Sequence, residues 1–168
     1  MVFVPSTPAL LPQYASTVDP VAELRAAVGA AVSWLLEDGD ATHVRGSLIG
    51  DRIVQHLLGD RRAREIDDRT NRLVVANGSA TRTEKAPGHL DERAAGFDAA
   101  IGAALRAGDP AGLAAIDVAL AAELWAMPDA DVLRSVGRSA PQVLDVRVDY
   151  DDAPYGVQYW VVRWECAS

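Results

Sequence analysis

The stretch Leu73-Val-Val-Ala-Asn-Gly-Ser-Ala-Thr-Arg-Thr-Glu-Lys-Ala-Pro-Gly-His-Leu-Asp-Glu-Arg93 passes from a short apolar run through a polar loop to the start of a helix. The run Leu73–Val75 has the bulky apolar side chains that fill a buried parallel strand. Asn77 and Gly78 tolerate the unusual backbone angles that occur where a strand ends. The order strand, loop, helix predicts an α/β fold around this stretch.

The polar loop from Gly78 to Leu90 is longer than the roughly two to six residues typical of a strand-to-helix connection. Loops of this length are functional or disordered, and ligands in open α/β sheets bind at the carboxyl ends of strands. We therefore take the loop as the candidate ligand site. Its candidate ligand-binding residues, which include one from the loop after the first strand, are Ser6, Asn77, Ser79, Thr81, Arg82, Glu84, Lys85 and His89.

Two interpretations of this loop remain open. The hydroxyls of Ser79 and Thr81, together with Arg82 and Lys85, favour a nest of backbone N–H groups and cations that binds an anion or another small polar ligand. The alternative is a loop held only by hydrogen bonds from Asn, Ser and Thr side chains to the backbone, with Glu84 and Lys85 paired or solvated.

The first half of the chain adds one strand and two helices. Val2–Val4 predicts a short strand that Pro5 ends. Asp19 and Pro20 are typical of a helix start, and this helix is expected to end near Gly39. A second helix is expected over 46–58, followed by a charge run at 60–69 that is typical of a solvated helix or linker. The apolar residues expected to face inward from the second helix are Leu48, Ile49, Ile53, Leu57 and Leu58.

The second half predicts further helices and two strands. One helix is expected from Asp91 to Gly108, one from 109 to 128, and a short one over 130–136. The residues expected to face the core from the 109–128 helix are Leu113, Ile116, Leu120 and Leu124. Leu144–Tyr150 alternates apolar and charged residues, the period of a half-buried strand, with Leu144, Val146, Val148 and Tyr150 on one face. Val157–Trp164 is apolar on both faces and should be the more central strand of the resulting hairpin.

These elements predict a single α/β domain over residues 1–168, with a mixed, mostly parallel sheet flanked by helices and closed by a C-terminal antiparallel hairpin. Tyr155, Tyr159, Trp160 and Trp164 gather near the C-terminus. If one of these tryptophans is exposed on the last strand, a homodimer contact becomes an option.

Composition narrows the classes of function. The chain has 168 residues, 49% of them apolar, and a formal net charge of −8, which argues against nucleic acid or an anionic membrane as partner. Cys166 is the only cysteine, which fits a reducing compartment, and together with the absence of a signal peptide it favours a cytoplasmic location. No apolar run is long enough to span a bilayer, and no motif for a cofactor or a metal is present.

Several spaced patches resemble a group of actinobacterial proteins that are similar to the B subunit of class III extradiol ring-cleavage dioxygenases, the LigB-type fold. The patches cover most of the chain from residue 73 onward and the N-terminal strand. They are 77–98, Gly108-Asp-Pro with Ile116-Asp117, Gly137-Arg-Ser-Ala-Pro-Gln-Val-Leu144 and Asp152-Ala-Pro-Tyr-Gly-Val157. The resemblance implies an α/β fold with its site at the strand ends.

The resemblance also implies a site of two His and one carboxylate on Fe(II), with a further His as acid/base. In the enzymes the first ligand lies in a Pro-His-x-Pro pattern, whereas Pro5-Ser6-Thr7-Pro8 puts Ser6 at that position. The acid/base His ends a second motif, which corresponds to Gly78-Ser79-Ala80-Thr81-Arg82 and puts Arg82 in its place. Arginine stays protonated and cannot act as that base. The chain is therefore expected to be a degenerate member without dioxygenase activity that binds a small polar or anionic ligand.

Two alternatives from other classes stay open. The first is an active metal-dependent oxidoreductase, in which His43 or His89 forms a displaced site with Glu84 or Glu123. His43 is expected to lie in a loop. The second is an oligomerising structural protein that uses the C-terminal hairpin as its interface. His56, the remaining histidine, lies at the edge of an apolar helical face and is expected to be structural.

Overall fold

The computed structural model describes residues 1–14, 19–63 and 71–167. Its strands are β1 (Val2–Val4), β2 (Thr42–Arg45), β3 (Arg72–Val75), β4 (Val143–Asp152) and β5 (Tyr159–Cys166). The α-helices are α1 (Ala22–Leu35), α2 (Leu48–Leu58), α3 (Arg93–Ala107), α4 (Pro110–Ala114), α5 (Val118–Glu123) and α6 (Asp129–Ser139). Short 3-10 helices span Pro8–Leu10, Pro12–Tyr14 and Gly59–Arg61.

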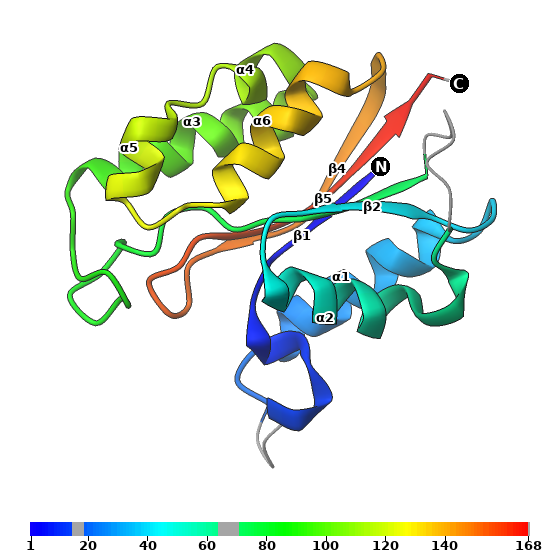
Figure 1. The fold of residues 1–168 in the computed structure, drawn as a ribbon, viewed down its shortest axis with the longest axis horizontal. Helices are drawn as coiled ribbons and strands as arrows, with labels where there is room; N and C mark the ends of the chain where they lie inside the picture. Colours follow the sequence, from blue (N-terminus) through cyan, green and yellow to red (C-terminus); the bar gives the residue numbers. More distant parts are fainter. Residues whose placement is uncertain (15–18, 64–70, 168) are drawn as a thin grey trace.

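The described strands form one sheet in the order β2-β3-β1-β5-β4. β1, β2 and β3 run parallel, while β5 is antiparallel to β1 and β4 is antiparallel to β5. The helices α1 and α2 cover one face of the sheet, and α3 to α6 cover the other (Figure 1). The α/β class, the mixed sheet flanked by helices and the C-terminal antiparallel pair are thus confirmed.

Successive residues of the central strands point to opposite faces and so supply two separate apolar cores. Phe3 and Val74 pack with α3 to α6, whereas their neighbours along β1 and β3 pack against α1 and α2. Trp164 is fully buried on the α3 side of the sheet. Its ring packs edge-on against Phe3, with 4.8 Å between the ring centroids, and its Nε1–H donates a 2.8 Å hydrogen bond to the Leu105 carbonyl.

Both tryptophans of β5 are buried, so the condition under which a tryptophan of this strand would offer a homodimer contact is not met. Trp160 is 3% and Trp164 is 0% exposed, because β5 lies between β1 and β4 with helices on both faces. The central position predicted for this strand is correct.

Four other expectations need correction. The segment around His43 is the edge strand β2 rather than a loop, because Thr42–Arg45 pairs with β3. Leu48 is 85% exposed, since it opens α2 and the helix buries a face made by Ile53, Val54 and Leu58. The 109–128 helix is two helices, because the Asp117 carboxylate accepts hydrogen bonds from the Ala119 and Leu120 N–H groups and starts α5.

The fourth correction concerns the face of β4. Irregularities between Val143 and Asp145, and again between Val148 and Tyr150, break the alternation seen in the sequence. Leu144 and Val148 are therefore exposed instead of buried. The charge run at 60–69 is described only through residue 63, and the rest of that prediction lies outside the described residues.

No helix among the described residues combines the length and the apolar character that crossing a bilayer requires.

Candidate functional site

A pocket of about 360 Å³ opens where β1 and β3 end. Parallel strands present their carboxyl ends at the same edge of a sheet, and loops there are free to differ from the packed core. The antiparallel strand β5 begins at this edge and closes the pocket from the other side. The lining residues are Ser6, Thr7, Pro8, Ser47, Ile49, Asn77, Gly78, Ala80, Pro87, Trp125, Ala126, Met127, Pro128, Asp129, Tyr155, Val157 and Tyr159.

Ser6 and Asn77 hold the two strand ends together. The Ser6 N–H donates to Oδ1 of Asn77 at 2.8 Å, and Nδ2 of Asn77 donates to the Ser6 carbonyl at 2.9 Å. The Ser6 hydroxyl lies 3.2 Å from the hydroxyl of Ser47, which caps the N-terminus of α2 by accepting from the Gly50 N–H. Two of the predicted site residues therefore meet at the pocket, and they hold it in shape.

Asp129 is a buried carboxylate in this pocket and was not predicted from the sequence. Its Oδ2 accepts a 2.9 Å hydrogen bond from the Asn77 N–H, while its Oδ1 is buried and has no hydrogen-bond partner among the described residues. The residue is only 7% exposed. Burial raises the pKa of Asp129 to about 6, against the smaller opposing effects of the Asn77 amide and of the Ser6 hydroxyl. That hydroxyl lies near the carboxylate but outside hydrogen-bond geometry, so Oδ1 still has no partner among the described residues.

A buried phenol also lines the pocket. The hydroxyl of Tyr159, the first residue of β5, donates to Oγ1 of Thr7 at 3.2 Å, and the same Oγ1 accepts a 3.4 Å bond from the Ala9 N–H. Burial raises the pKa of Tyr159, so the phenol stays neutral at physiological pH. The hydroxyls of Thr7 and Tyr159 therefore belong to the pocket lining together with the carboxylate of Asp129.

Large side chains that remain exposed also line this pocket. Trp125 is 61%, Tyr155 is 43% and Met127 is 37% exposed. Trp125 lies directly after α5 with a φ of 57°, a left-handed conformation that non-glycine residues seldom adopt. A mostly apolar pocket with aromatic side chains and a few polar groups is typical of a ligand site.

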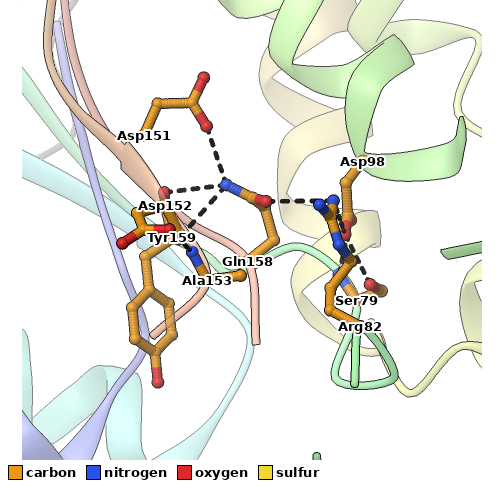
Figure 2. A network of polar contacts seen from close by, with 8 residues as sticks. All are labelled: Ser79, Arg82, Asp98, Asp151, Asp152, Ala153, Gln158 and Tyr159. Atoms are coloured by element: carbon orange, nitrogen blue, oxygen red, sulfur yellow. Dashed lines mark hydrogen bonds and ion pairs between the residues drawn. The ribbon is translucent and has the colours of Figure 1, made fainter. Parts of the chain in front are cut away.

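The predicted residues Ser79 and Arg82 belong to a neighbouring network that is already satisfied (Figure 2). The buried carboxylate of Asp98 accepts from the Ser79 N–H at 2.8 Å, from the Ser79 hydroxyl at 2.6 Å and from Nη1 of Arg82 at 3.3 Å. Arg82 also donates to Oε1 of Gln158, whose Nε2 donates to Asp151. Burial is the main influence on Asp98 and raises its pKa, although Ser79 and Arg82 oppose it.

This network also explains Gly78. A Cβ at Gly78 would lie 2.6 Å from both Oδ1 of Asp98 and Cη2 of Trp160. Neither Asn77 nor Gly78 has a positive φ, so the unusual backbone angles expected for them are absent. The glycine is needed for the close approach of the strand end to α3 and β5.

The other predicted loop residues do not line the pocket. Glu84 and His89 form an exposed pair, with 3.0 Å between Oε2 and Nε2, and Lys85 is also exposed. Thr81 is buried, and its Oγ1 has no hydrogen-bond partner among the described residues.

The donor groups do not fit the iron that the resemblance implies. Among the described residues that line the pocket, Asp129 is the only carboxylate and there is no histidine, and Ser6 stands where a ligand His is expected. Nowhere in the described ranges do three or more His, Cys, Asp or Glu side chains form a group that could hold a metal ion. Of the residues proposed for a displaced site, His89 and Glu84 do meet at 3.0 Å on the surface, but no third ligand joins them among the described residues. His43 lies on β2, and Glu123 pairs with Arg93 at 2.6 Å on the surface.

The sequence prediction includes Ser6 and Asn77 among the polar side chains that line this pocket and leaves out Thr7, Ser47, Asp129 and Tyr159. Asp129 follows Pro128 at the start of a helix, where Asp commonly occurs. The sequence around Asp129 therefore predicts a helix start and does not indicate a pocket residue. Thr7, Ser47 and Tyr159 come from three distant segments that no spacing links.

Comparisons of the chain with models of protein families, with curated proteins and with solved structures find no match.

Proposed function

We propose that this chain is a small-molecule-binding α/β domain whose ligand occupies the pocket at the ends of β1 and β3. The observation that carries the proposal is Asp129, a buried carboxylate in the pocket wall with one oxygen that no described residue satisfies. An unsatisfied buried polar atom is costly, and such groups are rare in native proteins unless they have a role. A ligand that donates a hydrogen bond supplies the missing partner.

The pocket favours a compact ligand with both a polar and an apolar part. Its volume of about 360 Å³ lies at the small end of the range for ligand sites. The polar part of the ligand can bind Asp129 and the hydroxyls of Ser6 and Ser47. The apolar part of the ligand can pack against Trp125 and Tyr155. An anionic ligand is disfavoured, because the carboxylate would repel it.

The relationship to LigB-type domains forms part of this proposal. Its support is the set of sequence patches and the position of Ser6, which follows β1 at the sheet edge where the pocket lies. In this proposal the domain keeps the place for a ligand and lacks ring cleavage, since a serine hydroxyl and an arginine replace the imidazoles of the enzymes.

Ligand-observed NMR with a fragment set that contains neutral, cationic and anionic members tests the proposal. We expect some fragments to bind, and we expect Tyr155→Ala to weaken them because it removes apolar surface from the pocket. Tyr14→Ala is the matched control, since Tyr14 is also exposed, at 54%, and does not line the pocket. The proposal is wrong if no fragment binds, or if both variants weaken binding equally.

A further inference from the structure

We propose that the ligand is a small organic cation, in which an ammonium or amidinium group meets Asp129 and an attached apolar body packs against Trp125 and Tyr155. This inference rests on the proposed function and deepens it by naming the chemical class of the ligand. It follows from the charge of the pocket, the unsatisfied oxygen and the aromatic side chains.

The negative charge of Asp129 is not balanced within the described lining of the pocket. Asp129 is the only charged side chain among the described lining residues, and no Arg, Lys or His accompanies it. The neighbouring cation Arg82 is paired with Asp98 and does not line the pocket. A buried carboxylate without a cationic partner is unfavourable, because burial removes its hydration and nothing replaces the lost interaction. A cationic ligand provides that partner.

The pocket also has room for several hydrogen-bond donors from a ligand. Oδ2 of Asp129 already accepts from Asn77, whereas Oδ1 has no partner. Because Oδ1 is sealed from water, a small rotation of the Asp129 or Ser6 side chain is needed before a ligand donor reaches it. An ammonium has three donors, so the hydroxyl oxygens of Ser6 and Ser47, 3.2 Å apart, are acceptors for the remaining N–H groups.

The pocket has an apolar and aromatic part as well. Trp125 and Tyr155 both line it and keep 61% and 43% of their surface exposed. Aromatic faces attract cations and also pack against apolar groups. Trp125 and Tyr155 can therefore contact either the cationic group of the ligand or its apolar body. The formal net charge of −8 also attracts cations to the protein at low ionic strength.

The test uses three probes of nearly equal shape: benzylamine, benzyl alcohol and benzoate. Isothermal titration calorimetry at about pH 7.5 gives their affinities for the full chain, for Asp129→Asn and for Asp131→Asn. The Asp131 control is matched, since it removes the same charge from the same first turn of α6 at an exposed position outside the pocket.

We expect the wild type to bind benzylamine at least about tenfold more tightly than benzyl alcohol, the effect of one charge-assisted hydrogen bond, and to bind benzoate most weakly. Asp129→Asn should abolish the preference for benzylamine, and Asp131→Asn should keep it. Equal affinity of the wild type for benzylamine and benzyl alcohol would overturn the cation inference, whether or not the variant folds, and would leave the pocket proposal intact.

A preference for benzylamine that survives in folded Asp129→Asn would also overturn the cation inference. If none of the three probes binds, the cation inference fails. If, in addition, no member of the broader fragment set binds, the proposed function fails with it.

Discussion

The main-chain N–H of Asn77 donates a 2.9 Å hydrogen bond to Oδ2 of Asp129, which joins the end of β3 to the first residue of α6. Asn77 uses its backbone for this bond, so its side chain can hold Ser6 at the end of β1. One residue thus fixes the position of both strand ends and of the helix that carries the buried carboxylate.

Replacing Asn77 by Ala should destabilise the fold by about 2 kcal/mol, because the Ser6 N–H and carbonyl lose their partners in a partly buried place. The bond from the backbone N–H to Asp129 should persist. Urea unfolding followed by circular dichroism measures the change. Gln142→Ala, at an exposed position, is the control and should change the free energy of unfolding by less than about 0.5 kcal/mol. Equal effects of the two substitutions would contradict the role assigned to Asn77.

The buried carboxyl of Asp129 should make stability depend on pH. Its folded pKa of about 6 lies above the ordinary value of 3.8, so the folded state holds a proton that the unfolded chain releases. The stabilisation from this proton is fully present below the unfolded pKa and is lost as the pH rises through about 6. Relative to Asp129→Asn, the wild type should lose about 3 kcal/mol of unfolding free energy between about pH 4 and pH 7.

Urea unfolding of the wild type and of Asp129→Asn across that pH range measures the difference between their free energies of unfolding. The titration of groups common to both proteins cancels in this difference. The other titratable groups of the pocket are the phenols of Tyr155 and Tyr159. The charged or titratable groups on the strands packed against α6 are His43 and Arg45 on β2 and Arg72 on β3. A difference that stays constant with pH would show that Asp129 titrates at its ordinary pKa.

Two glycine substitutions should have opposite signs. Gly78→Ala should destabilise by about 2 kcal/mol, because the new Cβ lies 2.6 Å from buried atoms of Asp98 and Trp160. Gly29→Ala should stabilise by up to about 1 kcal/mol, because Gly29 lies inside α1 and its Cβ would meet no atom within 4 Å. Thermal unfolding of the two variants checks both signs, and a stabilised Gly78→Ala would contradict the close approach of the strand end to α3.

The Asp98 network should contribute to stability and leave the pocket unchanged. Asp98→Ala removes the acceptor of Ser79 and Arg82 and should cost about 3 kcal/mol, as expected when one partner of a buried pair is lost. Asp131→Ala, an exposed change of the same kind, should have little effect. Chemical denaturation gives both values. A small loss for Asp98→Ala would show that the bonds from Ser79 and Arg82 to Asp98 contribute little to stability.

The central part of the fold could be predicted because its residues are apolar and buried on both faces. Leu73–Val75 and Val157–Trp164 belong to this class, and their strands were placed correctly. The edge strand β2 has the sequence Thr42-His-Val-Arg45, with a single strongly apolar residue, so only its pairing with β3 reveals it. The prediction of which β4 side chains face the core was wrong, because irregularities in its pairing with β5 shift the alternation. No local feature of the sequence indicates these irregularities.

The site was predictable to the extent that strand ends attract ligands. Ser6 and Asn77 follow strands and lie at the pocket, as this rule suggests. Ser79 and Arg82 follow the same strand but turn toward Asp98 on α3, a residue whose buried position is set by tertiary packing. The bond between Asn77 and Asp129 spans 52 residues, a distance over which local patterns carry no information.

The place of β5 in the sheet has a consequence for how the molecule matures. Among the described strands, β1 comes early in the chain and β5 late, yet they are neighbours, so one edge of β1 stays open until residues 159–166 leave the ribosome. The segment that closes this edge also brings Val157 and Tyr159 to the pocket. One C-terminal segment thus both covers the open edge of β1 and completes the lining of the pocket.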